Sequence, residues 1–259
     1  MLNWCAYCQQ FTGESPQYDD FRITHGLCAR CETRKLDLFS ASTVGHADFL
    51  RGIFDRLFGA GCRNDFETAA RIVDEAIAAH CRPVDVLVGM IAPMLFQIGE
   101  DWKRGVITVE GEHRFTAFSE KVIDLVESRM AVHAPALAPL PEAPLLFLMN
   151  APGNRHTLAV RILALWLESR GMKTRIVDEH AGLDVLMHDL ADARPGFLLI
   201  SMALPEQRDH VAEVAAHIQA LPVAPRPRLL VGGYPVKVGL VRSIPGADLV
   251  TDISALSFA

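Results

Sequence analysis

The chain has 259 residues, of which 50% are hydrophobic, and a formal net charge of −6. This length predicts one large domain or two small ones, and so apolar a composition excludes wholesale disorder. The weak acidic excess argues against a broad phosphate-binding surface. Because we see neither a secretion signal after Met1 nor an apolar run of about 18 residues, we expect a cytoplasmic protein with no membrane span.

Residues 1–36 are expected to form a small head, because they hold two pairs of cysteines. Cys5 and Cys8 make the first pair, and Cys28 and Cys31 make the second. This spacing is typical of a tetrahedral zinc site, and a bound metal would help so short a segment to fold. His25 is an alternative ligand. The competing interpretation is a flexible tail that carries four reduced thiols.

Residues 37–133 predict four helices that pack as a bundle. Apolar residues recur at helical spacing, Asp65 is placed to cap the second helix, and Pro83 suits the first turn of the third. Gly105 interrupts the pattern before the fourth helix. Residues 134–144 are rich in proline and predict a semi-rigid linker.

Residues 145–259 alternate between strand and helix patterns. We expect strands at 145–150, 173–178, 196–201, 228–232 and 248–251, and helices at 156–170, 182–192, 207–220 and 235–243. This alternation predicts an α/β doubly wound fold of the flavodoxin-like kind, whose ligand crevice lies at the carboxyl ends of the strands. None of the turns at these ends has a dinucleotide glycine fingerprint or a phosphate-loop lysine, so we set nucleotide binding aside.

Three of these strand ends carry candidate ligand-binding residues. His156 follows the first strand and is a candidate metal ligand. The segment from Ser201 to Leu204 ends the third strand, and Gly232 with Gly233 ends the fourth. Glycines there would let a ligand approach the backbone. On its own, His156 could equally be a helix N-terminal residue that is satisfied by backbone groups.

The stretch Asn154-Arg-His156-Thr-Leu-Ala159, together with Ser201 and the Gly232-Gly233 pair, resembles the cobalamin-binding domain family. That family carries an Asp-x-His-x-x-Gly signature, so Asn154 and Ala159 depart from it. The resemblance implies that His156 is the lower cobalt ligand and that Asn154 orients it. It also implies a slot for the displaced nucleotide tail beside Ser201, Leu204 and the two glycines.

Trp102 with Glu112 and His113 resembles the four-helix cap of cobalamin-dependent photoreceptor regulators. The resemblance implies that these three residues pack around the upper axial group, which we expect to be adenosyl. Lys103 stands where some relatives place a histidine that captures cobalt, and His113 is a possible substitute. The alternatives are a Trp102 in the bundle core and a solvated Glu112–His113 pair.

The joint resemblance implies a light-responsive, non-catalytic, cobalamin-binding transcriptional regulator, similar to the antirepressors that control pigment genes in purple bacteria. We expect the cap to rearrange when the upper group is lost. A transcription-factor protein is the favoured partner, because Arg30, Arg34 and Lys35 make only a small basic cluster for direct DNA binding. The alternatives are a corrinoid methyl carrier and a haem or bilin sensor, and homo-oligomerisation stays open.

Overall fold

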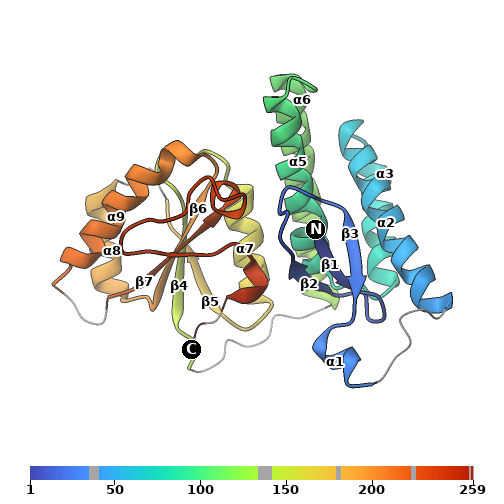
Figure 1. The fold of residues 1–259 in the computed structure, drawn as a ribbon, viewed down its shortest axis with the longest axis horizontal. Helices are drawn as coiled ribbons and strands as arrows, with labels where there is room; N and C mark the ends of the chain where they lie inside the picture. The colour runs from blue at the N-terminus through green and yellow to red at the C-terminus, as the bar shows by residue number, and fades with distance from the viewer. Residues whose placement is uncertain (35–40, 134–141, 179–181, 223–225, 257, 259) are drawn as a thin grey trace. The chain divides into compact units, whose positions relative to one another are not determined.

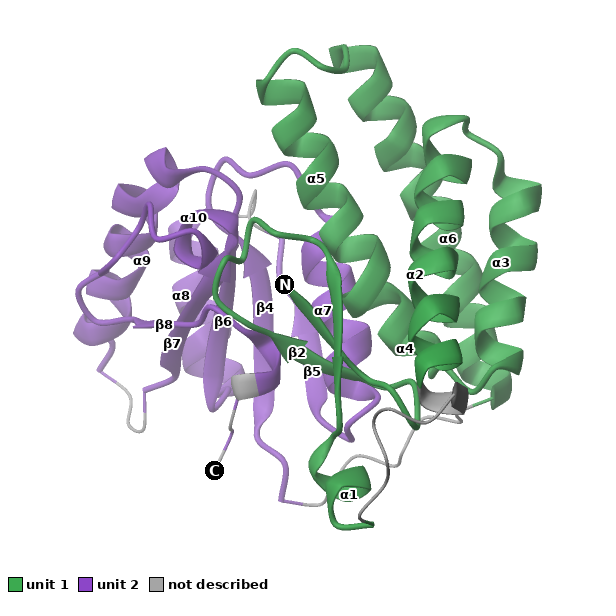
Figure 2. Ribbon diagram, turned by 45° about the vertical axis from the view of Figure 1, so that its right-hand side comes forward, with its two compact units in different colours: residues 1–135 green, residues 136–259 purple. Residues whose placement is uncertain are grey.

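The computed structural model describes residues 1–34, 41–133, 142–178, 182–222, 226–256 and 258. The chain forms two compact units, residues 1–135 and residues 136–259, which are coloured separately in Figure 2. The cysteine-containing head and the helices thus share the first unit. Residues 134–141 of the expected linker, and Lys35 of the expected basic cluster, lie outside the described residues.

The head is a three-stranded sheet followed by one helical turn (Figure 1). The central strand β1 (Leu2–Cys5) runs antiparallel to β2 (Phe11–Glu14) and parallel to β3 (Ile23–Gly26), and α1 (Ala29–Glu32) follows. Leu2 and Trp4 alternate along β1 and are both fully buried. This period-two burial shows that one face of the small sheet is packed against other parts of the unit.

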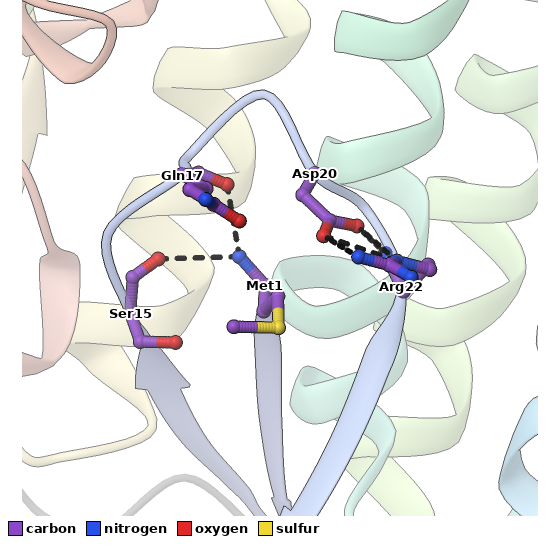
Figure 3. Close-up of polar contacts among 5 residues, drawn as sticks. All are labelled: Met1, Ser15, Gln17, Asp20 and Arg22. Atoms are coloured by element: carbon purple, nitrogen blue, oxygen red, sulfur yellow. Dashed lines mark hydrogen bonds and ion pairs between the residues drawn. The ribbon is translucent and has the colours of Figure 1, made fainter.

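The loop between β2 and β3 is held at the end of the head that lies opposite the cysteines. The Met1 ammonium group donates to the carbonyl oxygens of Ser15, at 3.2 Å, and Gln17, at 3.1 Å (Figure 3). Further along the loop, the Arg22 guanidinium hydrogen-bonds Asp20 and lowers the pKa of that carboxyl to about 2. Side-chain and backbone contacts therefore fix this end of the sheet.

Four helical runs make up the rest of the first unit, as predicted. They are α2 (Ala41–Cys62), α3 (Phe66–Ala78), a continuous run of α4 (Pro83–Val86), the π-helical turn η1 (Leu87–Ile91) and α5 (Ala92–Lys103), and α6 (Val109–His133). The Asp65 carboxylate caps α3 by accepting from the Thr68 N–H, and Pro83 lies in the first turn of α4. Both helix starts confirm the predictions.

The π-helical turn is a feature that helical periodicity did not predict. The Ala92 N–H bonds the carbonyl of Leu87, five residues back. Pro93 follows at once and has no N–H with which to continue the usual ladder, so the wider turn adjusts the helix to the proline. By length and composition alone, the run Pro83–Lys103 could cross a membrane, contrary to our expectation. However, 67% of its most apolar window is buried in the structure, as in a core helix.

The second unit is a doubly wound sheet of five parallel strands in the order β5-β4-β6-β7-β8, which confirms the flavodoxin-like fold. The strands are β4 (Leu145–Asn150), β5 (Lys173–Ile176), β6 (Phe197–Met202), β7 (Arg228–Gly233) and β8 (Asp248–Leu249). The helices are α7 (Leu158–Glu168), α8 (Leu183–Ala193), α9 (Arg208–Ala220) and α10 (Tyr234–Lys237), with short 3-10 turns at Pro205–Gln207 and Ile253–Ala255.

Helices cover both faces of this sheet. Buried residues of α8 and α9 form one apolar cluster with Phe147, Leu198 and Val231 of the strands, whereas α7 packs against β4 and β5. The last predicted helix, 235–243, was too long. It is the single turn α10, and Gly239 with a φ of +74° carries the chain away from the helix. The core therefore positions the carboxyl ends of β4, β6 and β7 at one edge.

Candidate functional site

Polar and small residues from three strands meet at the carboxyl edge of the second unit. Asn150 of β4 lies opposite Ser201 of β6, and Ser201 lies opposite Gly232 of β7. The chain leaves β4 toward β5 on one side while β6 lies on the other, so this edge is the topological switch point where open α/β sheets bind ligands. The structure thus brings together the strand ends that the sequence singled out.

The loop after β4 presents the imidazole of His156 to solvent. Arg155, His156 and Thr157 are all exposed, and α7 begins directly after them. Asn154, by contrast, is only 3% exposed, and its side chain is turned toward the sheet. His156 therefore offers an accessible ring nitrogen at this edge, just before the start of α7.

Asn154 does not contact the imidazole in this structure. Its Oδ1 accepts from the backbone N–H of His156 at 3.0 Å, while its Nδ2 donates to the Ser201 carbonyl at 3.2 Å and to Asn150 Oδ1 at 3.4 Å. An Asn oxygen that bonds the backbone two residues on forms an Asx turn. The expected bond from Asn154 to the ring is thus replaced by bonds to the loop and to the sheet.

The glycines at the end of β7 have a reason within the protein's own packing. Gly233 has a φ of +105°, and a Cβ there would lie 2.0 Å from the Met202 carbonyl oxygen. A Cβ on Gly232 would lie 3.2 Å from the carbonyl oxygen of Val250. Close packing of β7 on its neighbours therefore requires glycine at position 233, whether or not a ligand tail lies there. The role of both glycines in binding a ligand stays a prediction.

The turn after β6 is rigid, yet it exposes an apolar side chain. The Gln207 Oε1 accepts from the backbone N–H groups of Ala203, at 2.9 Å, and Leu204, at 3.1 Å, and Gln207 itself is buried. The Leu204 side chain remains 44% exposed. Exposed leucine on a fixed turn beside a polar strand edge offers an apolar contact for a ligand.

In the first unit, Trp102, Glu112 and His113 lie around the turn that joins α5 to α6. Trp102 is in the last turn of α5, and the other two residues are in the first turns of α6. Gly105, with a φ of +71°, ends α5 by donating its N–H to the Trp102 carbonyl at 2.9 Å. The predicted three residues are thus close in the fold and share one end of the bundle.

Trp102 is not a bundle core residue, because its side chain is 44% exposed. Val106 and Val109 next to it in sequence are 69% and 51% exposed. The Glu112 carboxylate accepts from Thr116 Oγ1 at 3.0 Å and lies 3.5 Å from His113 Nε2. The connection from α5 to α6 thus carries an exposed indole, exposed valines and a carboxylate, which are groups suited to contacting an amphipathic ligand.

The four cysteines of the head form one cluster. Their Sγ atoms all lie within 4.8 Å of one another, and Cys8 Sγ lies 3.8 Å from Cys28 Sγ. A tetrahedral zinc ion with Zn–S bonds of about 2.3 Å would hold its sulfurs about 3.8 Å apart. Since Cys5 and Cys31 are buried, the sheet and α1 bring both predicted pairs into ligand geometry rather than leaving them in a tail.

Backbone groups of the head favour a thiolate at this cluster. Burial alone would raise the pKa of Cys5, but the N–H groups of Cys8, Cys28 and Tyr7 hydrogen-bond its sulfur, and its pKa is lowered to about 7. Burial raises the pKa of Cys8 and of Cys31, as does hydrogen bonding within the cluster. A divalent metal would offset the cost of ionising several buried thiols next to one another, because it binds all four sulfurs as thiolates.

His25 is not one of the clustered residues. Within the described part of the chain, neither of its ring nitrogens has a hydrogen-bond partner, although both are buried. Burial lowers the pKa of this imidazole, and the nearby Arg51 lowers it further. The four thiols are therefore the better ligand set, and His25 is a neutral packing residue.

The head is attached to the long helix by contacts that sequence reasoning missed. The Asp85 carboxylate, fully buried, accepts from the Phe11 backbone N–H at 3.2 Å and from the Arg82 guanidinium at 2.7 and 2.8 Å. The ring of Trp4 packs on Gly89, where a Cβ would lie 2.4 Å from it. The sequence held one sign of this attachment: Asp85 and Gly89 lie one turn apart in an otherwise apolar helix.

Known proteins resemble the chain over much of its length. Residues 53–127 match the family described as B12 binding domain. The HTH-type transcriptional repressor CarH of Myxococcus xanthus is 26% identical over 171 residues, which are 65% of this chain and 50% of the repressor. An uncharacterized 20.5 kDa protein in the bchF-crtJ intergenic region of Rhodobacter capsulatus is 27% identical over 184 residues, 70% of this chain and 92% of that protein.

Among solved structures, the monomethylamine corrinoid protein of Methanosarcina barkeri has a TM-score of 0.64, with 16% identity, 76% of this chain covered and 91% of that one. An identity this low establishes a shared fold only. The chain spans about half the length of the repressor. The family match lies in the helices of the first unit, which also carry Trp102, Glu112 and His113.

Proposed function

We propose that this chain, which resembles cobalamin-binding domain proteins and carries a B12 binding domain match in its helices, is a light-responsive transcriptional regulator without catalytic activity. The observation that carries the proposal is the joint exposure of two sets of residues. His156 is exposed at the switch point of the sheet, and Trp102 is exposed beside Glu112 at one end of the bundle. The similarity to an HTH-type transcriptional repressor adds support.

The residues of the second unit fit the lower face of a cobalamin. The exposed His156 imidazole would provide the lower nitrogen ligand to cobalt, and Asn154 holds its loop. Ser201, Gly232 and Gly233 offer a narrow polar edge for the nucleotide tail, and the exposed side chain of Leu204 gives it an apolar contact. Cobalamin would supply a cobalt–carbon bond that light can break.

The residues of the first unit fit the upper axial group. The Trp102 indole would shield an adenosyl group from water, and Glu112 with His113 would hydrogen-bond its polar atoms. Lys103 pairs with Glu100 at 2.8 Å and, as an ammonium group, does not ligate cobalt. Loss of an adenosyl group would remove contacts that Trp102, Glu112 and His113 make only with that group, and such a difference would shift the conformation of the cap.

The conformational change of the cap is expected to act on a partner protein rather than directly on DNA. In the described part of the head, Arg30 and Arg34 are exposed but stand beside Glu32, so the surface offers little positive charge to a DNA backbone. A transcription factor that binds one state of the cap better than the other would convert the light signal into altered repression. Direct DNA binding through the head is the second possibility.

The head binds one zinc ion through Cys5, Cys8, Cys28 and Cys31. Supporting this proposal are the single cluster of four sulfurs and the N–H groups that donate to Cys5. The test is the zinc content of the purified protein by elemental analysis. We expect about one zinc per chain, and a Cys28→Ser variant should lose it, whereas substitution of the exposed Cys62 by serine should not.

The alternative from another class is a corrinoid methyl carrier, since the chain shares its fold with a corrinoid protein. A carrier must expose its methyl group to partner enzymes, and a Trp lid would oppose this. A haem or bilin sensor is a further alternative. Absorption spectra of the protein loaded with each cofactor distinguish these, because haem gives a Soret band and a bilin absorbs far to the red.

The deciding experiment is reconstitution with adenosylcobalamin in the dark, followed by illumination. We expect the wild type to retain the cofactor through gel filtration and to change its spectrum and its size, or its affinity for a partner, after light. His156→Ala should retain less cofactor and show the spectrum of a cobalamin with no lower nitrogen ligand. His210→Ala, an exposed control on α9, should behave as wild type. Equal behaviour of the two variants would remove His156 from the site.

A further inference from the structure

The loop that carries His156 is fixed by a pair of buried amides. Asn150, at the end of β4, is 2% exposed, and Asn154 in the loop is 3% exposed. Asn154 Nδ2 donates to Asn150 Oδ1, at 3.4 Å, and to the Ser201 carbonyl, at 3.2 Å. The same carbonyl accepts from the Ala151 N–H at 2.9 Å. One side chain thus connects the loop to two neighbouring strands.

The remaining oxygen of Asn154 is used by the backbone. Its Oδ1 accepts from the His156 N–H at 3.0 Å, and Asn154 donates its own N–H to the Ala151 carbonyl at 2.9 Å. Gly153, with a φ of +82°, allows this tight turn. These bonds set the direction in which the backbone presents His156, while the Asn154 oxygen is already occupied by a donor other than the imidazole.

We infer that Asn150 and Asn154 are a positioning pair, which orients His156 through its backbone and leaves the imidazole without an acceptor from residue 154. The inference rests on the proposed role of His156 as the cobalt ligand. An imidazole whose second nitrogen has no carboxylate acceptor is held less firmly in orientation and is a weaker metal ligand. The pair would therefore direct His156 toward cobalt while leaving the bond between its imidazole and the metal weak enough to break readily.

An acid would not fit position 154 in this arrangement. A carboxylate there would place an oxygen where Nδ2 now lies, 3.2 Å from the Ser201 carbonyl oxygen. Two acceptors without a hydrogen between them repel, and the buried carboxylate would also lose its hydration. Asn150 contributes the complementary acceptor, so the two amides are matched to each other.

The first test needs no cofactor. We expect the amide hydrogen of His156 to exchange about fivefold slower in the wild type than in Asn150→Leu or Asn154→Ala, because a hydrogen bond of about 1 kcal/mol closes the loop. Melting temperatures identify any variant whose fold is lost. Equal exchange rates of the His156 amide hydrogen in the wild type and in Asn150→Leu would show that Asn150 and Asn154 do not position the loop.

The second test uses protein loaded with adenosylcobalamin. Asn150→Leu should show a larger fraction of cofactor without a lower nitrogen ligand than the wild type, read from the visible spectrum. If Asn150→Leu keeps the wild-type spectrum, the positioning role is wrong. A wild type that binds no cobalamin but shows the expected exchange pattern would refute the proposed function and leave the amide pair standing.

Discussion

A single carboxylate joins the head to the bundle. Asp85 is 0% exposed on its side chain, whereas its partner Arg82 is 41% exposed, and Asp85 also receives the N–H of Phe11 from a strand 74 residues away in the sequence. Burial raises the pKa of the adjacent Cys81 thiol to about 12, and the Asp85 charge adds to this effect. Removing the carboxylate would leave one buried N–H and one partly buried guanidinium without an acceptor.

We predict that Asp85→Ala lowers the free energy of unfolding of the first unit by about 2–3 kcal/mol, because both donors lose their partner while solvent can still reach Arg82. The matched control is Asp48→Ala, which breaks the exposed pair with Arg51 and should cost less than about 1 kcal/mol. Urea unfolding followed by circular dichroism measures both. Equal costs for the two variants would contradict the structural role of Asp85.

Gly233, the last residue of β7, gives a second test at the scale of one residue. Gly233→Ala should destabilise the second unit by more than about 2 kcal/mol, because φ is +105° and the new Cβ would meet backbone atoms of Met202. Gly153→Ala, which also has a positive φ but open space around it, is the control and should cost less. Thermal unfolding of the two variants compares them, and a larger loss for Gly153→Ala would be inconsistent with close strand packing.

At the scale of elements, the π-helical turn is the surface on which the head rests. Trp4 and Phe11 pack edge to face with ring centroids 5.6 Å apart, and both rings lie against Gly89 in this turn. The helix then continues to Trp102 in its last turn. The head, the π-helical turn and the proposed cap residue thus belong to one continuous packed structure.

Gly89→Ala and Gly52→Ala form a matched pair at this scale. A Cβ at position 89 would lie within 3 Å of both aromatic rings, whereas position 52 in α2 has open space. We expect Gly89→Ala to destabilise the first unit by about 1–3 kcal/mol through overpacking, and Gly52→Ala to stabilise it by about 0.5–1 kcal/mol through helix propensity. Chemical denaturation gives both values. Effects of the same sign would show that the head does not pack on the π-helical turn.

Local signals predicted much of the fold. Strand β4 has the predicted bounds 145–150, and the caps at Asp65 and Pro83 are where the sequence placed them. These features depend on neighbours within a few residues. The attachment of the head to Asp85 and Gly89 could not be predicted, because it joins segments more than 70 residues apart. Helix 235–243 was predicted too long because Gly239 adopts a φ of +74°, which ends the helical conformation after one turn.

For the candidate site, the sequence predicted where the residues lie but not how they are hydrogen-bonded. His156, Ser201 and Gly232 were placed correctly at strand ends, since parallel strands bring such ends together. The bonding of Asn154 was not foreseen, because the choice between the ring and the backbone of His156 depends on Asn150 and on the Ser201 carbonyl. Residue identity indicated the chemistry, and tertiary contacts decided its geometry.

At the scale of the whole molecule, the two units should respond separately to loss of metal. We expect a zinc chelator to lower the unfolding temperature of the first unit, because binding to the folded state alone stabilises it and the metal site belongs to the packed head. The second unit should unfold as before. Calorimetry of the full chain resolves the two transitions, and a chelator that leaves both unchanged would argue against a structural metal.

The central claim is that the imidazole of His156 ligates cobalt, and electron paramagnetic resonance of the cobalt(II) form of the loaded protein tests it most directly. An axial nitrogen splits the cobalt lines, so labelling the histidines with the other nitrogen isotope should change the splitting in the wild type. In His156→Ala this dependence should vanish. A wild-type spectrum that is identical with labelled and unlabelled histidine would contradict the account.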